Sequence, residues 1–252
     1  MDSTQEFSQK RVWVTGAAQG IGYTTALAFV KAGAEVVGFD KHFSDGDYPF
    51  RTELLDITDP KAVREVCQRL LSECDELDVL VNGAGILRMG ATDELSDDDW
   101  HDCLAVNAGG AFNMFRYTLP VFRRQKRGAI VSIASNAAHV PRIGMSAYCA
   151  SKAALRSLCL SVGLEMAPYG VRCNLVSPGS TDTPMQRGMW TNATGEQQTI
   201  AGFPEQFKLG IPLGKIGKPQ DVADAVLFMA SDRAGHITMQ DIVIDGGATL
   251  SA

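Results

Sequence analysis

Short apolar segments alternate with longer amphipathic segments along the whole chain. The strand-like segments are residues 11–16, 35–40, 50–56, 77–85, 128–135, 171–179 and 241–247. Helical periodicity covers residues 21–34, 59–74, 96–125, 146–170 and 219–232, with a kink expected at Pro120. Strands and helices that alternate over short connections favour a mostly parallel sheet with helices on both faces. We therefore predict one α/β domain over residues 1–252, built as a doubly wound, seven-stranded sheet.

Composition narrows the partners and the compartment. The 252 residues are 45% hydrophobic, carry a net charge of −6 and contain no basic run, which argues against nucleic acid as a partner. We expect no membrane partner, because no apolar window approaches about 18 residues and the stretch MDSTQEFSQK has no apolar core. The six cysteines match no zinc spacing, so we expect no metal site and a reducing, cytoplasmic location.

The longest irregular segment covers residues 180–215. Within it, residues 183–210 carry Gly188, Gly195 and Gly202 but few large aliphatic side chains. Connections of this length are usually functional. We predict a substrate lid at about 183–210 that is mobile without ligand and closes over a bound substrate.

A glycine-rich turn, TGAAQGIG, joins the first strand to the first helix. Glycines there let the backbone approach a pyrophosphate at the helix N-terminus, where free N–H groups favour anions. This strand–turn–helix context predicts a Rossmann-type dinucleotide site, although a tight turn alone would also explain the glycines. The residues expected to contact the cofactor here are Gly16, Gln19, Gly20, Ile21 and Gly22.

Asp40 ends the second strand, eighteen residues after Gly22. A carboxylate at this place hydrogen-bonds the ribose hydroxyls of the cofactor and repels a 2′-phosphate. We therefore predict NAD rather than NADP as the cofactor. Lys41 and His42 follow directly, and a cation there could tolerate the extra phosphate.

Tyr148 and Lys152 stand four residues apart in a segment of helical periodicity, SAYCASKAAL. They would lie on one face of the helix, either as a solvated pair or as an acid–base pair. A free phenol has a pKa near about 10, and a neighbouring ammonium, with a cofactor cation close by, would lower it towards neutrality. Ser135, which ends the preceding strand, together with the glycine turn favours the acid–base interpretation.

These motifs together resemble the short-chain dehydrogenase/reductase family over essentially the full chain. The matching features are TGAAQGIG (15–22), Asp56, NGAG (82–85), Asn107, Ser135, YCASK (148–152), PGSTDT (178–183) and DGG (245–247). The family usually has NNAG where this chain has Gly83 as the second residue, a departure that we expect to leave the chemistry unaffected.

The resemblance implies roles for the residues that match. Tyr148 would be the general acid/base, Lys152 its electrostatic partner, Ser135 a hydrogen-bond donor to the substrate oxygen, and Asn107 the anchor of a proton-relay water. The further cofactor contacts that it implies are Asp56 at the adenine, Asn82 and Gly85 on the adenosine side, Thr181 and Thr183 at the nicotinamide carboxamide, and Tyr148 and Lys152 themselves. It also implies a homotetramer.

Within the family, four segments resemble dehydrogenases of catecholate siderophore biosynthesis, which oxidise a cyclohexadiene diol carboxylate to a catechol. The segments are AGILRMGATDELS (84–96), HVPRIGMSAY (139–148), SPGSTDTPMQR (177–187) and EQFKLGIPLGKI (205–216). Such a substrate needs a cation for its carboxylate. We predict Arg142 first and Arg88 second. The other candidate substrate contacts are Ser135, Met145, Met185 and Gln186.

Two alternatives stay open. The chain could be another member of the family, such as an oxoacyl-carrier-protein reductase or a cyclic-alcohol dehydrogenase. The resemblance to those reductases would imply NADPH and a basic residue in the glycine turn, where this chain has Gln19. A second alternative is an NAD-sensing protein without turnover. Relatives of that kind typically lack the tyrosine or the lysine, whereas Tyr148 and Lys152 are both present here.

Overall fold

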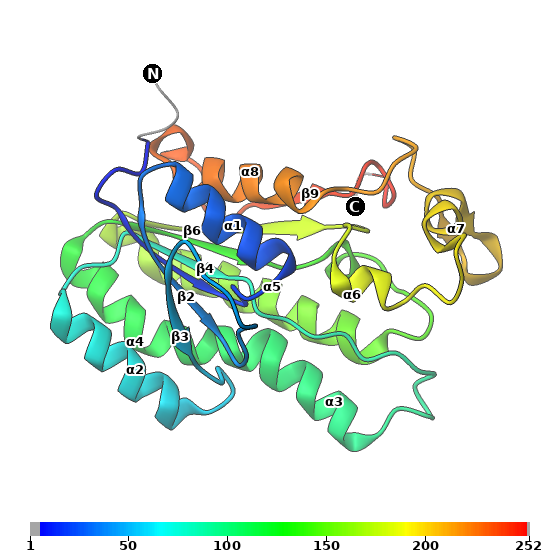
Figure 1. The fold of residues 1–252 in the computed structure, drawn as a ribbon, viewed down its shortest axis with the longest axis horizontal. Helices are drawn as coiled ribbons and strands as arrows, with labels where there is room; N and C mark the ends of the chain where they lie inside the picture. Colours follow the sequence, from blue (N-terminus) through cyan, green and yellow to red (C-terminus); the bar gives the residue numbers. More distant parts are fainter. Residues whose placement is uncertain (1–5, 251–252) are drawn as a thin grey trace.

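The computed structural model describes residues 6–250 and contains one seven-stranded sheet (Figure 1). Its strands are β1 Arg11–Thr15, β2 Glu35–Asp40, β3 Arg51–Leu54, β4 Val79–Asn82, β5 Gly128–Ile133, β6 Val171–Pro178 and β9 Asp241–Ile244. They follow the order β3-β2-β1-β4-β5-β6-β9, and every pairing is parallel. The predicted α/β, doubly wound fold is therefore confirmed. The order reverses between β1 and β4, where open α/β sheets bind their ligands.

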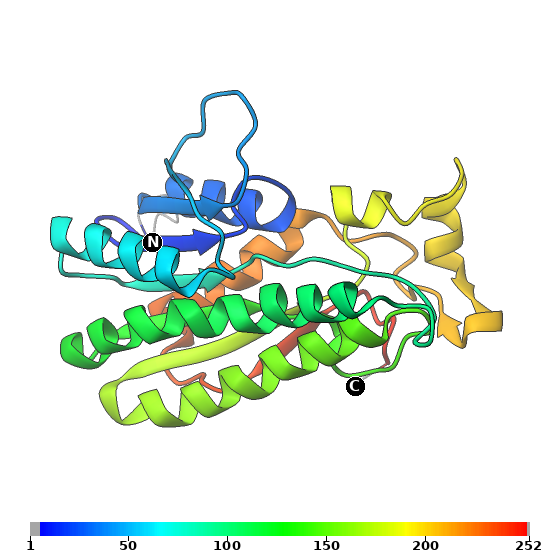
Figure 2. The same ribbon diagram turned by 90° about the horizontal axis from the view of Figure 1, so that it is seen from below.

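Helices cover both faces of the sheet (Figures 1 and 2). The longer helices are α1 Gly20–Lys31, α2 Pro60–Glu73, α3 Asp97–Leu104, α4 Gly110–Gln125, α5 Ser146–Met166 and α8 Pro219–Ala230. Helices α1 and α8 pack together on one face, and α2, α4 and α5 lie on the other. Because side chains alternate along a strand, β1 directs Trp13 into one core cluster and Val12 and Val14 into the other.

The long helix expected over residues 96–125 begins as predicted but is interrupted. Ser96 caps its start by accepting a hydrogen bond from the Asp99 backbone N–H at 3.0 Å. The interruption is a π-helical turn, Ala105–Gly109, and α4 then continues through Pro120. The interruption therefore lies at Asn107, and the kink at Pro120 stays a prediction. Such single π turns occur frequently at functional sites.

Residues 180–215 contain more regular structure than the sequence suggested. They form two short helices, α6 Pro184–Arg187 and α7 Gly195–Ala201, and an antiparallel hairpin of β7 Gly202–Phe203 with β8 Lys208–Leu209. In Figure 2 this segment projects from the body of the domain at the carboxyl ends of the strands.

Across residues 6–250, the helices lack the combination of length and apolar character that a membrane span requires. The same residues hold no cluster of three or more histidine, cysteine or acidic side chains suited to a metal ion.

Candidate active site

A cavity of about 450 Å³ lies at the carboxyl ends of the strands, between the glycine turn, α5 and the segment that contains α6 and α7. The predicted residues that line it are Gly16, Gln19, Gly20, Ile21, Gly22, Asp40, Asp56, Gly85, Ser135, Arg142, Met145, Tyr148, Lys152, Thr181, Thr183, Met185 and Gln186. Asn82, Arg88 and Asn107 are not among the lining residues. Segments far apart in the sequence thus meet at one site.

The glycine turn packs tightly against the turn after β4. Gly16 has φ of +72°, and a Cβ on it would lie 2.7 Å from the Ala84 Cα. A Cβ on Gly22 would lie 2.0 Å from the Gly16 carbonyl oxygen. The Thr15 hydroxyl accepts a hydrogen bond from the Gly83 backbone N–H at 3.1 Å, which fixes the two turns together. Glycine is therefore required at both positions, and the backbone is exposed to the cavity.

Two carboxylates stand at the β2 end of the cavity. Asp40 accepts hydrogen bonds from the backbone N–H groups of Ala18, at 3.0 Å, and Lys41, at 2.8 Å. The Lys41 ammonium lies 2.9 Å from an Asp56 carboxylate oxygen. Burial raises the pKa of Asp56, but hydrogen bonds from Thr58 and Lys41 outweigh it and lower the pKa to about 2. Asp56 therefore engages the Lys41 charge that could have attracted a phosphate.

Tyr148 and Lys152 lie on one face of α5, as predicted, with the ammonium nitrogen 5.9 Å from the phenol ring centroid. Lys152 Nζ donates a hydrogen bond to the Ile133 carbonyl oxygen at 2.9 Å. Burial lowers the pKa of Lys152 to about 8. Burial also raises the pKa of Tyr148, while the neighbouring Ser135 hydroxyl acts in the opposite direction.

The expected lowering of the Tyr148 pKa invoked a cofactor cation beside Lys152 and stays a prediction. In the chain by itself, desolvation disfavours the phenolate more than the Ser135 hydrogen bond stabilises it, so the pKa is raised. Additional positive charge in the cavity would be needed to bring the phenol pKa down.

Asn107 is buried in the π turn and is fully engaged by the protein. Its Oδ1 accepts from the Ile86 backbone N–H at 2.8 Å, and its Nδ2 donates to the Ile86 carbonyl at 3.0 Å and to the Ser151 hydroxyl at 2.8 Å. A Cβ on Gly85 would lie 3.2 Å from both Asn107 Oδ1 and Lys152 Nζ. The side chain thus holds the loop after β4, and the relay water at Asn107 stays a prediction.

Asn82 does not line the cavity. It is buried at the end of β4, and its Nδ2 donates to the Ser132 hydroxyl at 3.0 Å. Thr183, by contrast, faces the glycine turn, since a Cβ on Gly20 would lie 3.5 Å from the Thr183 methyl carbon. Its hydroxyl accepts from the Gln186 backbone N–H and caps α6.

The two candidate arginines separate clearly. Arg88 pairs with Asp99 at 3.1 Å and Asp102 at 3.2 Å on α3 and does not line the cavity, so the structure does not bring it to the other site residues. Arg142 lines the cavity, is half-buried, and forms no ion pair with any residue among 6–250. Burial lowers its pKa, as expected for a cation without an acidic partner.

Lys208 is a site residue that sequence reasoning missed. It lies on β8, lines the same cavity and is half-buried. Burial lowers the pKa of Lys208, and electrostatic repulsion from the Arg142 charge lowers it further. Nothing in EQFKLGI distinguishes this lysine from an exposed loop lysine, because the hairpin that places it depends on tertiary contacts.

Known proteins give a consistent result. Residues 16–249 match the family described as enoyl-(acyl carrier protein) reductase. A 2,3-dihydro-2,3-dihydroxybenzoate dehydrogenase of Escherichia coli is 66% identical, covering 98% of this chain and 100% of the relative. A 3-oxoacyl-acyl-carrier-protein reductase of Thermotoga maritima is 33% identical over 94% of this chain and 96% of its own.

Solved structures agree with the fold. The ligand-free aldohexose dehydrogenase of Thermoplasma acidophilum superposes with a TM-score of 0.88 at 31% identity, covering 99% of this chain and 97% of the other. Relatives that span nearly the full length in this way establish common descent of the whole domain. The chain therefore belongs to the short-chain dehydrogenase/reductase family of oxidoreductases.

Proposed function

We propose that this chain oxidises 2,3-dihydro-2,3-dihydroxybenzoate to 2,3-dihydroxybenzoate with NAD, in siderophore biosynthesis. One observation carries the proposal: the cavity that holds Tyr148, Ser135 and Lys152 also holds the half-buried, unpaired cation of Arg142. That combination suits an alcohol bearing a carboxylate. The 66% identical relative, named for this reaction, supports the same substrate.

The cavity fits a nicotinamide dinucleotide. Gly16 and Gly22 have no room for a side chain, so the glycine turn presents bare backbone to a pyrophosphate. Asp40 would take the ribose hydroxyls, Asp56 the adenine, and Thr181 and Thr183 the carboxamide. The cofactor, when bound, accepts the hydride released by the diol carbon. Asp40, with Lys41 held by Asp56, supports NAD over NADP.

The chain's own residues supply the proton transfer and the orientation. Ser135 donates a hydrogen bond to the reacting oxygen, and Tyr148 takes the hydroxyl proton as the C–H bond breaks. Lys152 stabilises the phenolate that accepts this proton, once positive charge from the bound cofactor offsets the effect of burial on Tyr148. The hydroxyketone formed then tautomerises to the aromatic catechol, which drives the reaction towards oxidation.

Arg142 would hold the carboxylate. A guanidinium can meet a planar carboxylate with two parallel hydrogen bonds and so fix the orientation of the ring. Orientation matters because hydride must leave one carbon of the diol and not its neighbour. Met145 and Met185 line the cavity and would pack against the ring, with Gln186 within reach from α6.

The segment 183–210 would act as a lid over this site. It supplies Thr183, Gln186 and Lys208 to the cavity wall and projects from the domain (Figure 2). Closure would exclude water during hydride transfer. Amide exchange within 183–210 should slow when NAD and substrate are added together. Equal exchange with and without the two ligands would remove the lid from the mechanism.

An acyl-carrier-protein reductase is the second candidate, favoured by the matched family description and the 33% identical relative. A direct assay separates the two. Adding NAD and 2,3-dihydro-2,3-dihydroxybenzoate should produce reduced-cofactor absorbance together with catechol fluorescence. Turnover of an oxoacyl thioester with NADPH, and none of the diol, would establish the second candidate instead.

A further inference from the structure

Two cations reach the cavity from separate segments of the chain. Arg142 comes from the loop between β5 and α5, and Lys208 comes from β8 in the lid. Within residues 6–250, neither forms an ion pair. The acid that acts on Arg142 is Asp245, whose carboxylate already accepts hydrogen bonds from Asn136, Gly247 and Thr249. The cavity therefore holds two cations that no carboxylate among residues 6–250 pairs with directly.

The hairpin fixes where the Lys208 ammonium lies. Lys208 is paired directly with Phe203 across β7 and β8, which places the two side chains on one face of the hairpin. Lys208 Nζ lies 5.4 Å from the Phe203 ring centroid, a cation–π distance. Gly202 has φ of +90°, and a Cβ on it would lie 2.4 Å from the Gly210 nitrogen. Lys208 is thus a positioned group and not a freely moving surface lysine.

Like charges that share a half-buried cavity repel each other more strongly than in water. Burial lowers the pKa of both cations, and Arg142 lowers that of Lys208 further. An anion bound beside both would reverse these effects. Because no carboxylate among residues 6–250 pairs with either cation, this place is open to an anion that a ligand carries.

We propose that Lys208 is a second binding residue for the substrate carboxylate and a determinant of specificity for acidic diols. This inference rests on the proposed function. Arg142 provides the planar fork that orients the carboxylate, and Lys208 provides a point charge from the lid. The carboxylate then links the lid to the body of the domain, so substrate charge itself favours closure.

Two substrates and a matched control test this role. The variant is Lys208→Met, and the control is Lys215→Met, an exposed lysine that follows the lid and lies outside the cavity. Lys208→Met should lower kcat/KM for the carboxylated diol by about 10- to 100-fold, mainly through KM. An uncharged cyclohexadiene diol should change by less than about twofold. Lys208→Arg should retain most activity, and Lys215→Met all of it.

Direct binding gives a second readout. Fluorescence titration of 2,3-dihydroxybenzoate onto the NAD-loaded protein should show a Kd weakened by a similar factor in Lys208→Met and unchanged in Lys215→Met. Lys208→Gln serves the same purpose if the methionine variant melts earlier than wild type.

The outcomes separate this inference from the function beneath it. Equal losses on both substrates, or no loss on either, would overturn the role of Lys208 while leaving the proposed reaction in place. A wild-type chain that leaves the carboxylated diol unoxidised would overturn the proposed function, and Lys208 with it.

Discussion

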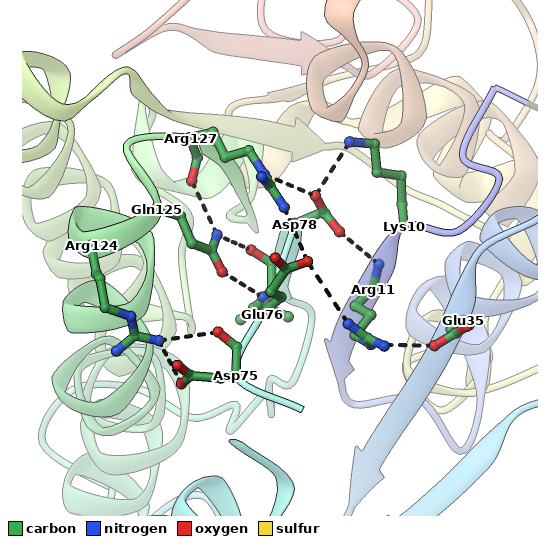
Figure 3. Close-up of polar contacts among 10 residues, drawn as sticks. Lys10, Arg11, Glu35, Asp75, Glu76, Asp78, Arg124, Gln125 and Arg127 are labelled. Atoms are coloured by element: carbon green, nitrogen blue, oxygen red, sulfur yellow. Dashed lines mark hydrogen bonds and ion pairs between the residues drawn. The ribbon is translucent and has the colours of Figure 1, made fainter. Parts of the chain in front are cut away.

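Charged side chains are paired differently at the two ends of the strands. At the amino ends of the strands, cations and carboxylates pair with one another: Asp78 contacts Lys10 at 3.3 Å and Arg127 at 3.6 Å and accepts from the Arg11 backbone N–H at 3.0 Å (Figure 3). At the carboxyl ends, Arg142 and Lys208 face a cavity without an acidic partner in residues 6–250. The charges named at the amino ends are thus paired within the protein, whereas these two cations at the carboxyl ends are left for a ligand.

Cavity size alone would place the active site at the amino ends of the strands. The hollow at the amino ends encloses about 670 Å³, against about 450 Å³ at the carboxyl ends. The half-buried Arg172 that lines it donates hydrogen bonds to the carbonyls of Met229, Ala230 and Ser231. The cavity at the carboxyl ends is distinguished by Arg142 and Lys208, two half-buried cations without an acidic partner in the described part of the chain. Burying charged groups unpaired costs free energy.

The sharpest test of the comparison removes the proton acceptor. Tyr148→Phe should lower kcat for diol oxidation by about 10²- to 10⁴-fold, the usual contribution of a general base. NAD affinity should be unchanged, because the ring is retained. Steady-state turnover together with cofactor titration checks both statements. Near-normal kcat in this variant would mean that another group takes the proton.

Removing Arg142, also at the carboxyl ends of the strands, should have the next largest effect on diol oxidation. Arg142→Ala should lower kcat/KM for the carboxylated diol by about 10²-fold, since two charge-assisted hydrogen bonds are lost. An uncharged cyclic diol should be oxidised nearly as well as by wild type. Kinetics on the two substrates provide the measurement, with Arg88→Ala as the matched control because Arg88 pairs with α3 instead. If both diols lose activity in proportion, Arg142 is structural.

The carboxylate at the end of β2 should show a smaller effect. Asp40→Ala should narrow the preference for NAD over NADP by about tenfold, because the carboxylate that binds the ribose and repels the 2′-phosphate is removed. The ratio of kcat/KM values for the two cofactors is the quantity to compare. Asp45→Ala, in the exposed loop that follows, should leave that ratio unchanged. An unchanged ratio in Asp40→Ala would contradict the role given to this residue.

Substitutions at the amino ends of the strands should change stability and leave catalysis unaffected. Asp78→Ala should lower the free energy of unfolding by about 1–3 kcal/mol, because the Arg11 N–H and two cations lose an acceptor that is largely buried. Asp75→Ala, at an exposed pair with Arg124, should cost less than about 0.5 kcal/mol. Denaturant titration measures both. A change in KM for the diol in Asp78→Ala would show that the amino ends of the strands are coupled to the active site at their carboxyl ends.

Much of the fold could be predicted because its signals are local. Strand β4, for example, is an apolar run buried on both faces, and Tyr148 and Lys152 share a face through simple helical spacing. The choice between Arg88 and Arg142 was harder, because it depends on where α3 places Asp99 and Asp102. Residue type and proximity to a motif do not reveal whether a charge already has a partner.

The parts that sequence reasoning missed depend on contacts between distant segments. Lys208 reaches the cavity because Gly202 and Gly210 let two short strands close against each other. The pKa of Tyr148 is raised because the phenol is buried by surrounding elements, which helical spacing to Lys152 does not express. Likewise, the π turn that carries Asn107 is a local deviation in a segment whose periodicity indicates one continuous helix.

The two hydrogen bonds between Asn107 and Ile86 use one backbone N–H and one backbone carbonyl of the same residue. This is the pattern by which neighbouring strands hold each other, so a single amide side chain replaces a missing strand beside the loop after β4. Through Ser151, the same amide also connects that loop to the helix of Tyr148 and Lys152. We therefore expect the wall of the site formed by the loop after β4 and α5 to stay fixed. Ligands would then enter and leave through movement of the lid, residues 183–210, on the opposite side.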